Sequence, residues 1–404
     1  MTQILLATLL MVALIMALAL GVMAARAVLV PSRPVRLTVN GRREVEARTG
    51  EKLLDALKAG GIPMPSGCAG AGTCGLCRVV VENPGVPLAT ETGTLGKPAT
   101  DRGERLACQT VLRGPMAVQV PDDVLSADRY DCEVLSNRSL APLIKELVLA
   151  LPDGADFDFV AGEYGQLTAP AYALDFANVD AGDFAGIWDR RGLRSLSAHS
   201  PDPVSRAYSI ANRPEDAGKV VFNIRLALPP VGKPGVPPGV VSSYLFGLNP
   251  GDRLALAGPY GSFRVRPSDR EIVLIGGGVG MAPLRAIAHE QLAGTAPPRR
   301  MSYFYGARSR SDLFYDDEFK ALAAAHPNFS WTVALSDPQP DDGWTGETGF
   351  IHDVALRAYL GTHPAPDACD YYLCGPPLMM QAVITMLDDL GVEPDAIFFD
   401  DFAS

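Results

Sequence analysis

The sequence predicts a multidomain chain with an N-terminal transmembrane helix, a small α+β domain, an antiparallel β-barrel domain and an α/β domain built on a parallel sheet. Three observations support this prediction. Residues 4–25 are apolar and uncharged, short β-branched segments separated by turns begin near Tyr130, and strands alternate with helices from about Arg270. Such alternation predicts a parallel, doubly wound sheet. A length of 404 residues agrees with two to four domains.

The composition excludes some classes of protein. Apolar residues make up 48% of the chain and charged residues 20%, so the chain can bury cores and is not of the disordered class. The net charge of −11 argues against nucleic acid as a partner. The seven cysteines are an odd number and form a poor disulfide framework. The gathering of Cys68, Cys74, Cys77 and Cys108 near the start indicates a metal site.

The apolar run 4–25 is long enough for a membrane anchor. As a helix it would measure about 33 Å, against a hydrocarbon core of about 30 Å. A cleaved signal peptide is the alternative, but it usually has a basic residue before a shorter apolar core. The basic residues follow the run: Arg26, Arg33, Arg36, Arg42 and Arg43. The positive-inside rule therefore predicts a single-pass anchor at residues 1–26, with the remaining domains in the cytoplasm.

The segment 34–127 is expected to form the first domain. Residues 35–45 alternate as a short hairpin around Gly41. Thr49 is the expected N-cap of a helix that buries Leu53, Leu54 and Leu57 and ends at the glycine pair 60–61. A strand over residues 78–81 follows the cysteine loop. Two further domains are expected over 128–267 and 268–404.

The cysteine loop has the spacing of an iron–sulfur site. Cys68, Cys74 and Cys77 form a C-x5-C-x2-C pattern, and Cys108 follows at a distance. Plant-type [2Fe–2S] clusters use C-x4-C-x2-C with a distant fourth cysteine, so the first gap is one residue longer here. A zinc site would usually pair two CxxC knuckles, and one is missing. Disulfides are the weaker alternative in a cytoplasmic body.

The predicted barrel carries two candidate elements for a flavin dinucleotide. Arg206 can clamp a pyrophosphate, Tyr208 can stack on an isoalloxazine ring and Ser209 can hydrogen-bond its edge, although an ordinary strand end is the more common meaning of such a tetrapeptide. About thirty residues later, Gly239, Ser242 and Ser243 open a helix, which makes an anion site. Residues 172–203 interrupt the strands with a long polar stretch without clear periodicity, which is usually functional or mobile.

The α/β domain carries a glycine-rich turn between a buried strand and a helix. Residues 276–283 read GGGVGMAP and miss the usual G-x-G-x-x-G frame, so alone they are weak evidence for a dinucleotide site. Cys374 and Gly375 follow another strand, at the edge where such sheets bind ligands. Arg308 could contact a 2′-phosphate, whereas Asp337 suits a free ribose, which leaves NADPH and NADH open on this evidence.

Taken in order, the R-x-Y-S motif, the G-x-x-S helix start and the GGVGMAP turn resemble the ferredoxin–NADP reductase superfamily. The resemblance covers residues from about 130 onwards. It implies that Arg206, Tyr208, Ser209, Gly239, Ser242 and Ser243 bind FAD. It also implies that Gly277, Gly278, Gly280, Pro283 and Gly375 bind the nicotinamide dinucleotide. In this superfamily the cysteine at the position of Cys374 lies beside the reacting atoms of nicotinamide and flavin, where it positions them.

Over the whole chain, the order of parts is similar to the F subunits of sodium-translocating NADH:quinone reductases. The segments that carry the similarity are SGCAGAGTCGLCRV, RAYSIAN, VPPGVVSSY, IGGGVGMAPLR, SYFYGARS, ALSDP, TGFIH, CGPP and the terminal DDF. The resemblance implies a β-grasp ferredoxin domain, FAD, one [2Fe–2S] cluster and NADH as donor. It further implies Phe402 beside the flavin, a six-subunit complex of the bacterial inner membrane, and reduction of ubiquinone coupled to sodium transport. Ala403 and Ser404 depart from the two glycines common in that family.

The implied activity is hydride transfer from NADH to FAD, followed by single-electron transfer to the cluster. The main alternative is the reductase component of a multicomponent oxygenase, which shares these cofactors but generally lacks an N-terminal span. A membrane-tethered protein with degenerate redox domains is disfavoured, because all four cysteines and both nucleotide motifs are intact. One apolar helix without an ionisable residue offers no ion pathway, so sodium transport would reside in partner subunits.

Overall fold

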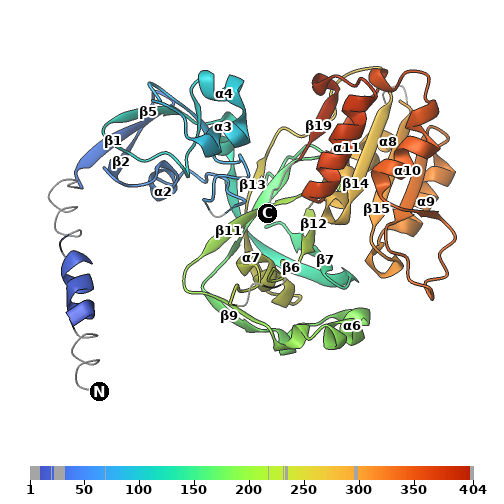
Figure 1. The fold of residues 1–404 in the computed structure, drawn as a ribbon, viewed down its shortest axis with the longest axis horizontal. Coiled ribbons are helices and arrows are strands. Elements are labelled where there is room, and N and C mark those ends of the chain that lie inside the picture. Colours follow the sequence, from blue (N-terminus) through green and yellow to red (C-terminus); the bar gives the residue numbers. More distant parts are fainter. Residues whose placement is uncertain are drawn as a thin grey trace. The chain divides into compact units, whose positions relative to one another are not determined.

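The structure is a computed structural model that describes residues 10–19, 21, 32–68, 70–216, 218–230, 232, 235–294 and 299–400 (Figure 1). It divides into two compact units. One comprises residues up to 64 together with residues 70–125, and the other comprises residues 65–69 together with residues 126–404.

A five-stranded mixed sheet with short helices forms the first unit. The strand order is β2-β1-β5-β3-β4, with β1 antiparallel to β2 and parallel to β5. The strands are β1 Pro34–Val39, β2 Arg43–Arg48, β3 Arg78–Val81, β4 Glu104–Leu106 and β5 Met116–Gln119, and the helices are α2 Leu53–Ala59, α3 Ala89–Leu95, α4 Lys97–Asp101 and α5 Asp122–Ser126. Leu37 and Val39 of β1 are buried, as are Leu53 and Leu57 of α2. This agrees with the predicted hairpin, helix and α+β class.

The predicted N-cap at Thr49 is wrong. Helix α2 begins at Leu53 after an extended Lys52, and no side chain caps it. The Leu53 N–H donates to the Thr110 carbonyl at 2.9 Å, so a backbone partner satisfies the donor that a cap would serve. The Thr49 hydroxyl instead accepts a hydrogen bond from the Arg33 N–H at 2.9 Å.

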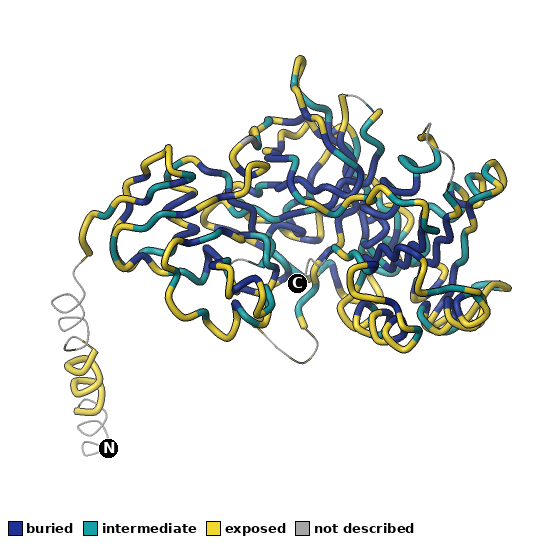
Figure 2. Tube along the Cα trace, turned by 90° about the horizontal axis from the view of Figure 1, so that it is seen from above, coloured by how far each residue is buried: buried dark blue, intermediate teal, exposed yellow. Residues whose placement is uncertain are grey.

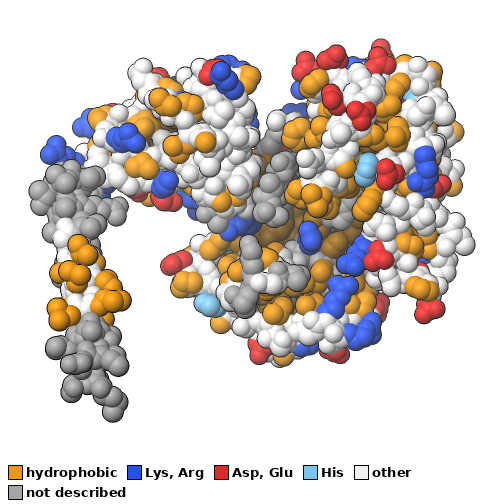
Figure 3. Space-filling model, viewed as in Figure 1, with side chains coloured by type: hydrophobic (Ala, Val, Ile, Leu, Met, Phe, Trp, Pro, Cys, Tyr) orange, Lys and Arg blue, Asp and Glu red, His pale blue; other side chains and the backbone are white. Residues whose placement is uncertain are grey.

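The N-terminal residues 10–19 form a helix whose side chains are all exposed. Its large apolar side chains include Leu10, Leu14 and Leu18, each more than 60% exposed. Figure 3 shows hydrophobic side chains on the surface of this helix. Among the residues that the structure describes, no helix is both long and apolar enough to cross a membrane. Much of the predicted span 4–25 lies outside the described residues.

An antiparallel sheet begins the second unit. Its order is β11-β8-β13-β6-β7-β12, and a bridge between Ile210 and Phe222 links its two ends into a barrel. The strands are β6 Asp128–Ala141, β7 Ile144–Ala150, β8 Tyr164–Ala169, β11 Val204–Ser209, β12 Lys219–Arg225 and β13 Arg253–Tyr260, and helix α7 spans Val240–Gly247. The fully buried Leu167, Phe222 and Leu245 belong to one core that joins the strands to α7. The predicted antiparallel barrel is therefore present.

The segment 172–203 has regular structure that the sequence pattern does not reveal. Its elements are β9 Tyr172–Asp175, η1 Phe176–Asn178, η2 Gly182–Phe184, α6 Ala185–Arg190, η3 Leu193–Ser195 and β10 Ser197–Ser200. β9 and β10 pair antiparallel. Phe176 and Trp188 are buried in the barrel core, and the Trp188 indole N–H donates to the Pro142 carbonyl at 2.6 Å. These elements are too short to show a helical or strand period.

A six-stranded parallel sheet in the order β17-β16-β15-β14-β18-β19 follows (Figure 1). The strands are β14 Ile272–Gly277, β15 Met301–Ala307, β16 Phe329–Leu335, β17 Glu347–Thr348, β18 Asp370–Cys374 and β19 Ile397–Phe399, and the helices are α8 Met281–Ala293, α9 Asp316–Ala325, α10 Ile351–Ala358 and α11 Pro377–Asp389. Leu274 packs with α8 and α9 on one face, and Val273 packs with α10 and α11 on the other. Helices cover both faces of the sheet, so its strands are buried, and the predicted doubly wound class is confirmed. Figure 2 marks the buried residues along the chain.

Candidate functional site

The cysteine loop brings three predicted ligands together. Cys74, Cys77 and Cys108 are buried, and no disulfide joins the chain's seven cysteines, all of which lie in described residues. A hydrogen bond with the Cys108 side chain and burial raise the pKa of Cys77 well above its ordinary value, and Cys74 contributes to the same effect. Sulfur atoms this close cannot all be thiolates unless a cation lies among them. The donor set therefore fits an iron centre, which supplies that charge.

Polar side chains fix the loop around these sulfur atoms. Gly70 and Gly72 have positive φ angles of 85° and 83°, which glycine adopts without strain. The Thr94 hydroxyl donates to the Gly72 carbonyl at 2.7 Å, and Gln109 Nε2 donates to the Gly70 carbonyl at 2.8 Å. Gln109 Nε2 also donates to Cys108 Sγ at 3.6 Å. No motif in the sequence marks Thr94 or Gln109.

The first cysteine of the pattern lies in a different unit. Cys68 belongs to residues 65–69, which group with the second unit, and it is half-buried. Its assignment as the fourth ligand stays a prediction from spacing.

The predicted flavin residues Arg206, Tyr208 and Ser209 lie along β11. Arg206 Nη1 donates to the Ser205 carbonyl at 2.8 Å. Burial raises the pKa of the half-buried Tyr208, and the nearby Arg206 charge opposes that rise. Ser209 Oγ donates to Asp400 Oδ2 at 2.9 Å, which ties the strand end to the residue after β19. The sequence prediction missed Asp400, although it lies in the terminal segment that carried the family resemblance.

At the start of α7, the predicted Gly239, Ser242 and Ser243 have clear packing roles. A Cβ at Gly239 would lie 2.7 Å from the Cβ of Ala227. The Ser242 hydroxyl donates to the Gly239 carbonyl at 3.1 Å and accepts from the Ala227 N–H at 3.2 Å. Ser243 is fully buried. Any anion at this end would therefore meet backbone N–H groups rather than the Ser242 hydroxyl proton.

One buried polar atom beside β11 fits a polar ligand. Gln166 of β8 lies opposite Ala207 in the strand pairing and is 4% exposed. Among the described residues its Nε2 has no hydrogen-bond partner. A buried amide donor without a partner is costly, so a group that accepts from it would stabilise this site.

The glycine turn after β14 lies against the end of β18. Gly276 pairs with Cys374 in the parallel ladder, and a Cβ at Gly280 would lie 1.9 Å from the Cys374 carbonyl oxygen. A Cβ at Gly375 would lie 2.4 Å from Met379 Cε. Gly280 and Gly375 thus bring the two loops into contact at the carboxyl edge of the sheet. Cys374 itself is 6% exposed.

Open space adjoins the same turn. Gly278 has a φ of 56°, and nothing lies within 4 Å of the position of its Cβ. Its carbonyl accepts a hydrogen bond from the Tyr305 hydroxyl at 3.0 Å, which fixes the peptide. Pro283 and Gly277 are buried in the flanking helix and strand. A helix start with open space at the carboxyl edge of a parallel sheet suits a dinucleotide pyrophosphate.

The two residues that bear on NADH preference form an ion pair. Arg308 follows β15 and Asp337 follows β16, and Arg308 Nε and Nη2 both donate to Asp337 Oδ2 at 3.2 Å. Both side chains are more than half exposed. The Asp337 carboxylate would repel the 2′-phosphate of NADPH. It also pairs with Arg308, the side chain that could otherwise bind that phosphate.

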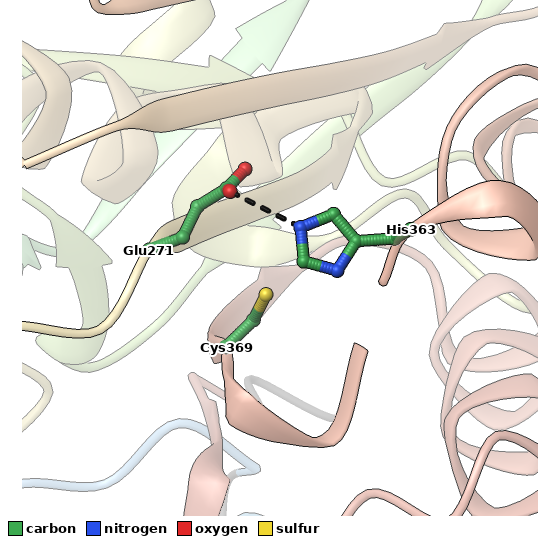
Figure 4. A group of neighbouring side chains, drawn as sticks. All are labelled: Glu271, His363 and Cys369. Carbon is green, nitrogen blue, oxygen red and sulfur yellow. Dashed lines mark hydrogen bonds and ion pairs between the residues drawn. The ribbon is translucent and has the colours of Figure 1, made fainter. Parts of the chain in front are cut away.

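Glu271, His363 and Cys369 are side chains of metal-ligand type that lie near the amino ends of β14 and β18 (Figure 4). Glu271 precedes β14, and Cys369 precedes β18. Their ligand atoms and one from His363 lie within 4.8 Å of one another. The Ala365 N–H donates to His363 Nδ1 at 3.2 Å, so Nε2 carries the proton and donates to Glu271 at 3.3 Å. Because a metal needs the Nε2 lone pair, the contacts favour a hydrogen-bonded network over a metal site.

Three domain families among known proteins match the chain. Residues 37–113 match the 2Fe-2S iron-sulfur cluster binding domain, residues 195–265 the oxidoreductase FAD-binding domain and residues 274–385 the oxidoreductase NAD-binding domain. The F subunit of the Na(+)-translocating NADH-quinone reductase of Methylococcus capsulatus is 44% identical over 405 residues, which covers 100% of both chains. The chain belongs to this family of F subunits. The corresponding protein of a Marinomonas species is also 44% identical, over 99% of this chain and 98% of its own.

Solved structures are similar to this chain over most of its length. A cytochrome P450 reductase of Amycolatopsis is 27% identical with a TM-score of 0.61, and covers 91% of this chain and 98% of its own. A ferredoxin reductase in carbazole 1,9a-dioxygenase is 26% identical with a TM-score of 0.59, and covers 92% and 99%. The predicted ferredoxin, FAD and NAD domains are confirmed. The chain is an oxidoreductase with domains for a [2Fe–2S] cluster, FAD and NAD. The predicted Phe402 contact lies outside the described residues.

Proposed function

We propose that this chain oxidises NADH and delivers single electrons to the other subunits of a membrane NADH:quinone reductase. The observation that carries the proposal is the union of iron–sulfur, FAD and NAD domains in one chain with full-length relatives of that name. When bound, FAD accepts hydride from NADH and releases electrons one at a time to a [2Fe–2S] cluster, so the protein's task is to hold and space these groups.

The residues of the barrel are suited to holding FAD. Arg206 supplies positive charge for the pyrophosphate, and the backbone at the start of α7 supplies N–H groups for the same anion. Tyr208 offers its ring for stacking. Ser209, whose proton is directed to Asp400, offers its remaining lone pairs to the flavin edge.

The residues of the parallel sheet are suited to orienting NADH. Gly277, Gly278 and Pro283 shape the start of α8, whose N-terminal end favours a pyrophosphate. Cys374 lies at the end of the adjacent strand, where its side chain would set the depth of the nicotinamide ring. Asp337 would favour the free ribose of NADH over the phosphorylated ribose of NADPH.

The membrane attachment and partners complete the proposal. Residues 4–25 would span the inner membrane once, because the described part is helical, apolar and exposed, and basic residues follow it. The domains 34–127, 128–267 and 268–404 would then face the cytoplasm. Quinone reduction and sodium transport would take place in other members of a six-subunit complex.

The ligand assignment is tested by Cys68→Ala in the full chain, with Cys132→Ala as the matched control. Cys132 is buried in the barrel and is not a predicted ligand. We expect Cys68→Ala to abolish cluster reduction while NADH still bleaches the flavin, and Cys132→Ala to retain both. Unimpaired cluster reduction in Cys68→Ala would remove Cys68 from the ligand set.

The second candidate function is a reductase component of an oxygenase, which the similarity to the carbazole dioxygenase reductase favours. Membrane fractionation separates the two functions. A membrane-anchored chain stays with membranes after an alkaline wash, whereas an oxygenase reductase component remains in the supernatant.

A further inference from the structure

A partly buried polar cluster joins the barrel to the parallel-sheet domain within the second unit. It consists of Arg285, Tyr315 and Glu318 from the sheet domain and Glu146 and Asn223 from the barrel, and we call it the interdomain clamp. Arg285 lies on α8, the helix that follows the glycine turn. Its side chain is 17% exposed and that of Glu318 is 27% exposed.

Arg285 is held on three sides. Its Nη1 donates to the carbonyl of Ala211 at 2.7 Å. Ala211 lies two residues after Ser209 in the barrel. The Nε and Nη2 of Arg285 donate to the two carboxylate oxygens of Glu318 at 2.7 and 3.1 Å. The guanidinium also lies over the ring of Tyr315, 4.5 Å from its centroid. The planar fork matches a carboxylate in two hydrogen bonds, a geometry that lysine cannot reproduce.

Tyr315 makes the second connection to the barrel. Its hydroxyl donates to the Glu146 carboxylate of β7 and accepts from Asn223 Nδ2 of β12 at 3.0 Å. Its backbone has a φ of 58°, in the left-handed region that is unfavourable for a side chain with a Cβ. The hydrogen bonds of its hydroxyl and the guanidinium of Arg285 over its ring keep this conformation in place.

The charged groups of this cluster add little to the free energy of unfolding, because they lose water when they are partly buried. The Arg285–Glu318 ion pair is partly buried and so loses part of its hydration, and apolar residues of the same size often stabilise a protein equally well. The ion pair lies within the sheet domain and fixes the guanidinium of Arg285, whose Nη1 makes the hydrogen bond to the barrel at Ala211. Ala282 and Ala211 pack together nearby, so the first turn of α8 rests directly on the chain that leaves β11.

We infer that the interdomain clamp positions the NADH-binding turn against the flavin-binding strand, with Arg285 and Tyr315 as positioning residues for hydride transfer. The inference rests on the proposed function. Arg285 lies one turn into the helix that starts at the glycine turn, and its barrel partner lies next to the R-x-Y-S strand. Loss of the fork to Glu318 would release the guanidinium from the Ala211 carbonyl and would therefore shift donor and acceptor sites relative to each other without touching either ligand. A shift of about 1 Å can slow such a reaction about 10²-fold.

The test compares Arg285→Lys and Tyr315→Phe with matched variants whose carboxylate partners lie inside the sheet domain. Arg299→Lys is the control for the first, because Arg299 Nη2 pairs with the buried Asp370 at 2.6 Å. Tyr359→Phe is the control for the second, because Tyr359 also donates its hydroxyl to a glutamate, Glu271. For each full-length variant, anaerobic stopped-flow absorbance gives the limiting rate of flavin reduction and the dissociation constant of NADH. Calorimetry gives the unfolding transitions.

We expect Arg285→Lys to lower the limiting rate at least tenfold, with the NADH dissociation constant and flavin content within twofold of the wild type. Tyr315→Phe should lower it less. Both controls should keep the wild-type rate even where they lower the melting temperature. Calorimetry should show the barrel and sheet domains unfolding at more widely separated temperatures in Arg285→Lys than in Arg299→Lys.

An unchanged limiting rate in Arg285→Lys would overturn the inference, as would an equal loss in both arginine variants. Flavin content and bleaching by excess NADH serve as a separate readout. If the wild-type chain fails to bind flavin or to oxidise NADH, the proposed function fails. If the wild type works and only the rate comparison fails, the clamp alone is refuted.

Discussion

Replacing Gly280 by alanine would strain the contact between the two loops of the NADH site. The added Cβ would lie 1.9 Å from the Cys374 carbonyl oxygen, 2.3 Å from its carbon and 2.8 Å from the Gly375 nitrogen. These are backbone atoms, so no side-chain rotation relieves the clash. Because the distance from the Cβ to the Cys374 oxygen must rise from 1.9 Å to at least 3.0 Å, the two backbones must separate by more than 1 Å. We expect a loss of about 1–3 kcal/mol in the free energy of unfolding, as for other overpacked sites.

The same displacement moves Cys374 relative to the start of α8. Because about 1 Å of misplacement can cost about 10²-fold in rate, the limiting rate of flavin reduction by NADH should fall by one to two orders of magnitude. Gly294→Ala is the control, because Gly294 ends the same helix and its Cβ would lie 3.4 Å from the Glu290 carbonyl. Stopped-flow reduction and chemical denaturation measure both effects. A Gly280→Ala variant with the wild-type rate would refute the tight packing of the two loops.

Three further predictions follow from single side chains. Burial lowers the pKa of Lys145 from 10.5 to about 8. Between these two pH values the unfolded chain holds a proton on Lys145 that the folded chain has lost. The free energy of unfolding of the wild type should therefore rise with pH in this range. Lys145→Met should remove that slope and raise stability at pH 7 by up to about 3 kcal/mol, as measured by urea denaturation across pH. Asp337→Ser should release Arg308 and raise kcat/KM for NADPH at least tenfold while lowering that for NADH, and unchanged selectivity in steady-state assays would count against the ion pair as its source. Trp188→Phe removes the hydrogen bond to Pro142 and should cost about 1–2 kcal/mol, checked by thermal unfolding, with no change in NADH oxidation.

The sequence predicts an element correctly where its pattern of apolar and polar residues matches the burial that the element has in the folded protein. The apolar run before Gly276 reads as a buried strand because both faces of the parallel sheet are covered. The ligand spacing of Cys74 and Cys77 is also local. The structure brings both close to Cys108, which the sequence predicts as a ligand because the plant-type pattern has a distant fourth cysteine.

The missed features depend on contacts that sequence pattern does not encode. The elements in 172–203 are held by burial of Phe176 and Trp188 in the barrel core, not by their own periodicity. Arg285 meets a carbonyl 74 residues away, and Ser209 meets Asp400 at a separation of 191 residues. Thr49 has the residue type of an N-cap, but the backbone donors of α2 find partners in a neighbouring segment.

An anaerobic titration of the purified full-length chain with NADH tests the proposed electron path most directly. Absorbance follows the flavin, and electron paramagnetic resonance at low temperature follows the cluster. The proposed path predicts that NADH bleaches the flavin and produces the signal of a reduced [2Fe–2S] cluster in the same sample. Flavin bleaching without any cluster signal, in protein shown to contain iron and acid-labile sulfide, would contradict it.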